Sequence, residues 1–287
     1  MGHCAPSVMQ TLLQLNNITD DELILFSGAM AGGIAGASTE CGCMTSPLMF
    51  GSYRNNHYST EDKLKLIGQS QIYVKEFIAF NGSGMCNAIR SKGLSSCINA
   101  VCNFHYPYSR AGSGISLLSN ESKESYSRLI TEFQENEFHC TQKVLEILGD
   151  DIPVTEEKLK ASWIFLGGIA MLNKTCGALT GGVLALSTAF SKIEDSYSRV
   201  ARMNWLLMHE RTNEALAEET NNFNRSILLS EELGVWFRNE FGSTSCSDIW
   251  GYNFSKARDA ESFINGRCIN QCKLITQKVA GKVRTMI

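Results

Sequence analysis

The amino-acid sequence predicts an all-α protein built from two tandem homologous helical domains. Apolar residues recur at helical spacing, and no alternating segment is long enough to indicate a β-sheet. The 24 glycines and only 4 prolines indicate helices separated by glycine turns. A segment that reads Gly-Gly-Ile-Ala, five residues, Cys-Gly occurs twice, at Gly32–Gly42 and Gly167–Gly177. Because an internal repeat marks a duplicated structural unit, we expect two copies of one helical fold.

The expected helices follow the same order in both copies. Apolar spacing from Val8 to Leu15 predicts a first helix. Thr19, followed by three acidic residues, predicts the cap of a second helix that extends to Met30. A third helix is expected to begin at Cys41. The further predicted helices are Glu61–Phe80 in the first copy and, in the second, Thr155–Leu166, Cys176–Glu210, Ala215–Phe241 with a break allowed inside it, and Cys268–Val283.

Four landmarks recur in the same order, each centred on a cysteine. The later intervals differ between the copies, as expected where loops carry insertions. We therefore expect a first repeat at residues 1–110, a linker at 111–135 with a helix from about Glu121, and a second repeat at 136–287. The repeats are expected to pack about a pseudo-twofold axis. The landmarks are Cys4, Cys41, Cys86 and Cys97 in the first copy and Cys140, Cys176, Cys246 and Cys268 in the second.

Charge, hydropathy and cysteine content restrict the class of protein. A formal net charge of −3 does not favour nucleic acid or an anionic membrane surface as a partner. No run approaches the roughly 18 apolar residues of a membrane-spanning helix. The N-terminal segment lacks the basic region, apolar core and cleavage site of a signal peptide, so we expect a cytoplasmic protein. Eleven cysteines at repeated spacings then indicate metal ligation or thiol redox chemistry rather than a disulfide scaffold.

The cysteines that begin predicted helices carry the clearest chemical signal. Cys41 and Cys176 are expected in a first helical turn, with Thr39 and Thr175 as N-caps. Free backbone N–H groups and the helix dipole at that position favour thiolate over thiol. Thiolate is the form that binds a metal or attacks a disulfide. The alternative is a packing motif of small residues that contains an incidental buried cysteine.

Each copy supplies four thiols, the number that a [2Fe–2S] cluster, a [4Fe–4S] cluster or a tetrahedral zinc ion requires. In the second copy, Cys268 and Cys272 lie four residues apart on one helical face, so either can be the fourth ligand. Cys43 takes the position of Ala178 in the other copy and is expected to be a packing residue or a thiol specific to the first copy. The histidine before the first cysteine of each copy is either structural or a ligand or proton partner of the centre.

The chain resembles the redox-active family named for its C-GCAxxG-C-C cysteine pattern. The second copy carries the pattern as Cys140, Cys176-Gly177-Ala178-Leu179-Thr180-Gly181, Cys246 and Cys268 or Cys272. The first carries it as Cys4, Cys41-Gly42, Cys86 and Cys97, with Cys43 and Ser46 in place of the alanine and the last glycine. A related domain occurs in split-Soret cytochromes c, which carry an iron–sulfur site beside their haems. No CxxCH haem motif is present here, so the resemblance implies an iron–sulfur or other redox-active cysteine centre without haem.

These observations favour an iron–sulfur cluster-binding protein that serves electron transfer or small-molecule redox chemistry. Its expected partners are a redox protein or a small-molecule substrate, and a second copy of the chain is a further candidate. One alternative is a thiol–disulfide oxidoreductase in which Cys41 or Cys176 attacks and a later cysteine resolves. Another is a protein that zinc holds together. The candidate ligands are Cys4, Cys41, Cys86, Cys97, Cys140, Cys176, Cys246, Cys268 and Cys272.

Overall fold

The computed structural model describes residues 3–36, 38–55, 59–104, 118–192, 220–222 and 224–287, together with the single residues 198, 201 and 205. Its regular structure is helical, and apart from isolated bridges no strand occurs in these ranges, which confirms the all-α prediction. None of the described helices is long and apolar enough to cross a membrane. One continuous hydrophobic core includes residues of both halves of the chain.

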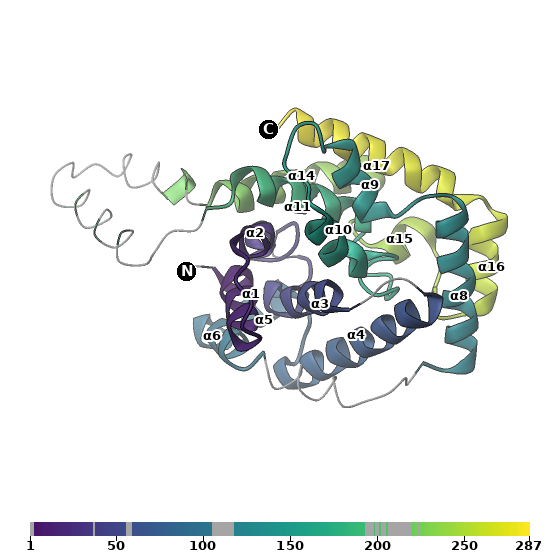
Figure 1. The fold of residues 1–287 in the computed structure, drawn as a ribbon, viewed down its shortest axis with the longest axis horizontal. Helices are drawn as coiled ribbons and strands as arrows, with labels where there is room; N and C mark the ends of the chain where they lie inside the picture. Colours follow the sequence, from purple (N-terminus) through teal and green to yellow (C-terminus); the bar gives the residue numbers. More distant parts are fainter. Residues whose placement is uncertain are drawn as a thin grey trace.

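The helices of the two halves follow one another in matching order (Figure 1). The first half contains α1 (Cys4–Leu15), α2 (Asp21–Phe26), the 3-10 helix η1 (Gly28–Met30), α3 (Gly42–Arg54), α4 (Thr60–Asn81), α5 (Cys86–Arg90) and α6 (Leu94–Cys102). The second half contains α9 (Cys140–Ile147), α10 (Glu156–Ser162), η2 (Trp163–Phe165), α11 (Gly177–Phe190), α14 (Arg225–Phe241), α15 (Cys246–Trp250), α16 (Ala257–Asn265) and α17 (Cys268–Arg284). Helix α8 (Asn120–Glu135) precedes it.

Several helix boundaries differ from the sequence prediction. The predicted second helix stops at Phe26 and continues as the short η1, and its N-cap is Asp20, whose carboxylate accepts the Leu23 N–H at 2.9 Å. Helix α11 ends at Phe190, not at Glu210, because Ser191 adopts an extended conformation. Most of the remaining predicted segment, from residue 193, lies outside the described residues. Helix α14 begins at residue 225, after the separate helical residues 220–222.

The predicted linker contains a helix that belongs to the core. Helix α8 buries Tyr126, Leu129, Ile130 and Phe133 and packs on α4 of the first half and α16 of the second. Residues 111–117 lie outside the described residues. The expected helix in the linker is therefore present, and it joins the two halves. The domain boundaries themselves stay a prediction.

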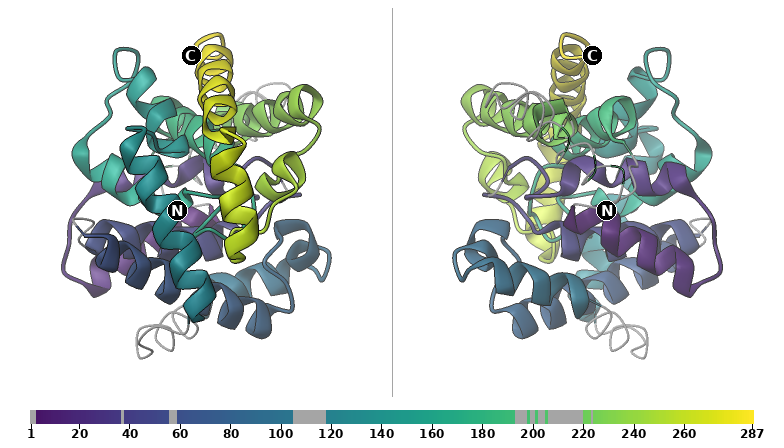
Figure 2. Two further views of the ribbon diagram at one scale, coloured as in Figure 1. Left: turned by 90° about the vertical axis from the view of Figure 1, so that its right-hand side faces the viewer. Right: turned by 90° about the vertical axis from the view of Figure 1, so that its left-hand side faces the viewer.

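The two halves exchange equivalent contacts. Helix α3 of the first half packs on α10 and η2, while its counterpart α11 packs on α2 and η1. Ser52 and Ser187 occupy the same position in the two repeats, and each bonds to the opposite half. The Ser52 hydroxyl donates to the Lys160 carbonyl, and the Ser187 hydroxyl accepts the Ala29 N–H, both at 2.8 Å. Figures 1 and 2 show most of the purple-to-blue first half below the teal-to-yellow second half. Such reciprocal packing is what a pseudo-twofold axis requires.

Candidate functional site

Short antiparallel contacts hold the second and third landmark cysteines together in each half. In the first half, Glu40 and Met85 form an isolated bridge, and the backbone N–H groups of Cys41 and Cys86 each donate to the opposite segment at 2.9 Å. Cys41 is the N-cap of α3, and Cys86 is the first residue of α5. This bridge therefore places two thiol-bearing helix starts side by side.

The second half repeats the same arrangement. Thr175 and Ser245 form the bridge, and the backbone N–H groups of Cys176 and Cys246 donate across it at 2.8 and 2.7 Å. Cys176 is the N-cap of α11, and Cys246 begins α15. The cysteines thus occupy the cap positions that the sequence assigned to Thr39 and Thr175, so that assignment was wrong.

A glycine turn and a helix start enclose the first cysteine of each half. The backbone N–H of Gly32 hydrogen-bonds to the Cys4 sulfur, and that of Gly167 to the Cys140 sulfur. Both glycines have positive φ, at 82° and 61°, which a side chain would strain. The repeated Gly-Gly turn therefore aims a backbone donor at a sulfur atom.

The glycine that follows the second cysteine of each half leaves room for the sulfur atom of the first cysteine. A Cβ atom at Gly177 would lie 2.2 Å from the Cys140 sulfur, and one at Gly42 would lie 3.3 Å from the Cys4 sulfur and 2.7 Å from the Met30 carbonyl oxygen. Only glycine fits at both positions without displacement of the neighbours. The Cys-Gly pair in the repeated motif is explained by this contact.

The first half gathers five thiols. Hydrogen bonding with the Cys43 thiol lowers the pKa of Cys4 to about 7 and also lowers the pKa of Cys41. The same two interactions raise the pKa of Cys43 well above its ordinary value. Burial, followed by repulsion from Cys41 and Cys4, raises the pKa of Cys86 to about 12 and also raises that of Cys97. Sequence reasoning treated Cys43 as an extra thiol, whereas the structure places it between two candidate ligands.

The second half gathers four thiols, all with raised pKa. Burial is the main cause at each of them, and repulsion from neighbouring thiolates adds to it at Cys176, Cys246 and Cys272. The pKa of Cys176 is raised to about 12, so burial outweighs the helix N-terminus that was expected to favour thiolate there. The four are Cys140, Cys176, Cys246 and Cys272.

The structure separates the two candidates for the fourth thiol of the second half. Repulsion from Cys246, Cys176 and Cys140, and least of all from Cys268, adds to the effect of burial on the pKa of Cys272. Cys268 shows no such interaction with the other three thiols. Burial raises the pKa of Cys268, and a hydrogen bond with Tyr252 opposes that rise. Cys272 therefore belongs to the thiol group formed by Cys140, Cys176 and Cys246, and Cys268 lies beside that group. Sequence spacing favoured neither, because both lie on one face of α17.

One hydrogen bond joins equivalent positions of the two halves. The Thr175 hydroxyl donates to the Glu40 carboxylate at 2.5 Å, and both side chains are 3% exposed. Each residue immediately precedes the N-cap cysteine of its half. Equivalent residues that touch each other lie on the pseudo-twofold axis, so this bond marks the axis between the two thiol groups. Sequence reasoning missed Glu40, whose only signal was an acidic residue inside a small-residue motif.

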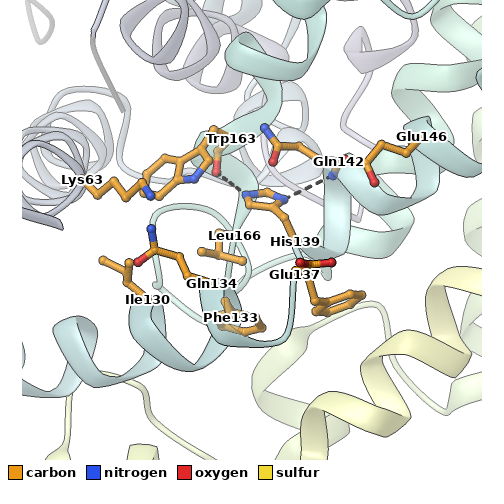
Figure 3. Close-up of a pocket in the computed structure, with 11 residues that line it drawn as sticks. Lys63, Ile130, Phe133, Gln134, Glu137, His139, Gln142, Glu146, Trp163 and Leu166 are labelled. Atoms are coloured by element: carbon orange, nitrogen blue, oxygen red, sulfur yellow. Dashed lines mark hydrogen bonds between the residues drawn. The ribbon is translucent and has the colours of Figure 1, made fainter. Parts of the chain in front are cut away.

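His139 acts as a structural histidine. Its Nδ1 accepts the Gln142 N–H at 3.2 Å and caps α9, and its Nε2 lies 2.9 Å from the Trp163 carbonyl oxygen (Figure 3). This pattern requires the neutral form with a proton on Nε2. Both ring nitrogens are thereby engaged, which favours the structural interpretation over a ligand role.

The thiols of each half are potential ligands of a metal group. Among the described residues, no three His, Cys, Asp or Glu side chains are arranged as ligands of a single metal ion. An iron–sulfur cluster takes its cysteines on several irons rather than around one ion. All eleven cysteines are free thiols. In each half four of them are buried or partly buried and repel one another as thiolates, and added positive charge would relieve that repulsion. The residues present therefore fit a cysteine-ligated cluster.

Comparison with protein families identifies the chain. Two regions, residues 2–107 and 138–286, match the family described as "Putative redox-active protein (C_GCAxxG_C_C)". The chain belongs to this family. Its two matches show that the family unit is duplicated in tandem and support a general redox role. Comparisons with curated proteins and with solved structures returned no match.

Proposed function

We propose that this family member is an iron–sulfur cluster-binding redox protein with one cysteine-ligated centre in each half. The first centre uses Cys4, Cys41, Cys86 and Cys97, and the second uses Cys140, Cys176, Cys246 and Cys272. The carrying observation is that each half brings four thiols into one electrostatic neighbourhood without a disulfide. A bound cluster would supply reversible one-electron transfer.

The protein's own residues would hold the sulfurs and limit the access of water. The bridges fix the second and third cysteines of each centre, and the Gly32 and Gly167 N–H groups bond to the first. Gly42 and Gly177 leave room for close approach of that sulfur. A redox partner protein or a small-molecule substrate in the cytoplasm would exchange the electrons.

The test is purification without oxygen, followed by a visible spectrum and assays of iron, acid-labile sulfide and zinc on one sample. Brown protein with matched iron and sulfide supports the proposal, and the iron content shows whether one or both halves are loaded. Colourless protein with zinc that unfolds on chelation would assign the thiols to a structural zinc site instead. Protein that stays free of iron and sulfide after anaerobic reconstitution would refute the proposal.

A thiol–disulfide oxidoreductase is the second candidate, and one observation favours it in the first half. Hydrogen bonding to Cys43 lowers the pKa of Cys4 and Cys41, which raises the fraction of attacking thiolate near neutral pH. The high pKa of Cys176 argues against the same role in the second half. Trapping a mixed disulfide at Cys41 in metal-free protein would favour this activity. Thiol exchange that is unchanged by Cys41→Ser would exclude Cys41 as the nucleophile.

A further inference from the structure

A cavity of about 260 Å³ lies where the first half, α8 and the second half meet (Figure 3). Lys63 of α4 forms one wall, Phe133 and Gln134 of α8 form another, and His139 and Trp163 of the second half form a third. Its volume is just below the roughly 300 Å³ at which pockets for drug-sized ligands begin, so it suits a smaller molecule.

Lys63 is a buried cation for which the described residues supply no ion-pair partner. Its side chain is 8% exposed, and burial lowers the pKa of its amine. No ion pair of Lys63 occurs within the part of the chain that the structure describes. Lys158 is buried to a similar degree, but its amine pairs with Glu22 at 2.7 Å and donates to the Pro153 carbonyl at 2.9 Å. Because an unpaired buried charge is costly, Lys63 has the most to gain from an anionic ligand.

The other charged residues that line the cavity are two glutamates, Glu137 and Glu146. Glu146 is paired with Lys143 at 3.1 Å, and Glu137 lies in the turn between α8 and α9 with a φ of 47°. Figure 3 shows Lys63 at the left of the view, the Glu137 carboxylate near the middle and Glu146 at the right. His139 is neutral, because both its ring nitrogens are engaged as described above. The aromatic rings of Phe133 and Trp163 line the space.

We propose that this cavity binds a small aromatic acid, with its carboxylate on Lys63 and a hydrogen-bond donor directed to the Glu137 side. Aromatic walls suit a flat ring, and a desolvated ammonium suits one carboxylate. The cavity also adjoins the second centre. His139 directly precedes Cys140, and Leu166 of its wall directly precedes Gly167, which bonds to the Cys140 sulfur. Binding itself does not require a cluster, whereas a role as the substrate site rests on the proposed function.

The test measures binding of 4-hydroxybenzoate to the full-length protein by titration calorimetry, before any metal reconstitution. The uncharged 4-hydroxybenzamide is the matched ligand, and Lys63→Met and Lys65→Met are matched variants, because Lys65 is exposed on the same helix. We expect saturable binding of the acid, weakened about 10- to 100-fold by Lys63→Met and unchanged by Lys65→Met. The amide should bind more weakly and independently of Lys63.

Several outcomes would overturn the site. They are no saturable binding of the acid, equal binding of acid and amide to the native protein, or equal binding of the acid to the native protein and Lys63→Met. The acid–amide comparison needs no variant, so it holds even if Lys63→Met fails to fold. We expect Lys63→Met to fold and to have a higher melting temperature than the native protein, because it removes an unpaired buried charge. Because no metal enters this experiment, its failure is distinct from a failure to load iron.

Discussion

The two halves share one backbone frame but surround their thiols differently. In both, a glycine turn bonds to the first cysteine, and a bridge pairs the second with the third. Only the first half has Cys43, where the second has Ala178, and only the first half has cysteines with lowered pKa. Duplication thus preserved the positions of the first three thiols of each half. The fourth differs, because Cys97 of the first half corresponds to Cys268, whereas Cys272 joins the thiols of the second half. The exchange of Cys43 for Ala178 further separates the chemistry of the two halves.

The largest expected effect tests whether the second half has its own centre. Cys272→Ser should abolish that centre and about halve the iron bound per chain, because Cys272 lies with the other three thiols. Cys268→Ser is the control and should keep the full iron content, because its thiol bonds to Tyr252 instead. Iron and sulfide assays on both variants measure the difference. If Cys268→Ser lost iron and Cys272→Ser kept it, Cys268 would be the ligand.

The next effect tests the contact that both halves share. Gly177→Ala should lower the free energy of unfolding by about 3 kcal/mol, because the new Cβ would lie 2.2 Å from the Cys140 sulfur. Gly281→Ala, at a helix position where the new Cβ would meet no atom within 4 Å outside the adjoining residues and the helix's own backbone, should raise it by about 0.5–1 kcal/mol. Urea unfolding of both variants measures the difference. A neutral Gly177→Ala would mean that Cys140 lies elsewhere.

The bond on the axis tests how firmly the halves are joined. Thr175→Val should cost about 2 kcal/mol, because the one hydrogen bond to the Glu40 carboxylate found among the described residues is lost while the carboxylate stays buried. Thr188→Val removes a hydroxyl that donates to the Leu184 carbonyl within α11, its one hydrogen bond to a described residue, and should cost less than about 1 kcal/mol. Thermal unfolding measures the stability of both variants. Equal losses of stability would mean that the Thr175–Glu40 bond contributes no more than a hydrogen bond within one helix.

The smallest expected effect comes from replacing Cys43, the side chain that distinguishes the first half from the second. Cys43→Ala should raise the pKa of Cys4 from about 7 to its ordinary value or above, because the hydrogen-bond partner of the thiolate is removed. Alkylation of Cys4 by iodoacetamide at pH 7 should slow about 5- to 10-fold, since the lost thiolate fraction outweighs the gain in nucleophilicity. Peptide mass spectrometry follows the rate.

The reciprocal change, Ala178→Cys, is the control for that exchange. It adds a thiol beside Cys176 and should lower the pKa of Cys140 or Cys176, if the two frames are equivalent. Faster alkylation of either residue would support the equivalence. No change would mean that features besides Cys43 separate the halves.

Sequence patterns predicted most of the helices and most of the gathered thiols but not what surrounds them. The repeated cysteine landmarks predicted most of the thiols that gather in each half, because equivalent positions in a repeat adopt equivalent places. They did not predict Cys43 in the first half, nor Cys272 in place of the landmark Cys268 in the second. They could not predict the end of α11, which contains no proline or terminal glycine. There Ser191 packs against Gly28 of the other half, a contact that helix propensity does not contain.

The electrostatics of the thiols could not be predicted from local position. Cys176 at a helix start was expected to be acidic, but its burial raises the pKa to about 12. The choice between Cys268 and Cys272 likewise depended on how α17 is rotated against its neighbours. Both properties arise from packing between distant segments, which a local pattern does not record.

The Glu40–Thr175 bond also bears on how such a protein can evolve. In a symmetric dimer of single repeats, the residue on the axis faces an identical copy of itself, so a buried glutamate there would meet a second glutamate. Joining the repeats in one chain allows each side of the axis to mutate alone. A hydrogen-bond acceptor in one half can then face a donor in the other. The interface between the halves becomes asymmetric at this point, which the interface of a symmetric homodimer cannot be. The thiol group of each half consequently borders a partner half that is not an identical copy of its own.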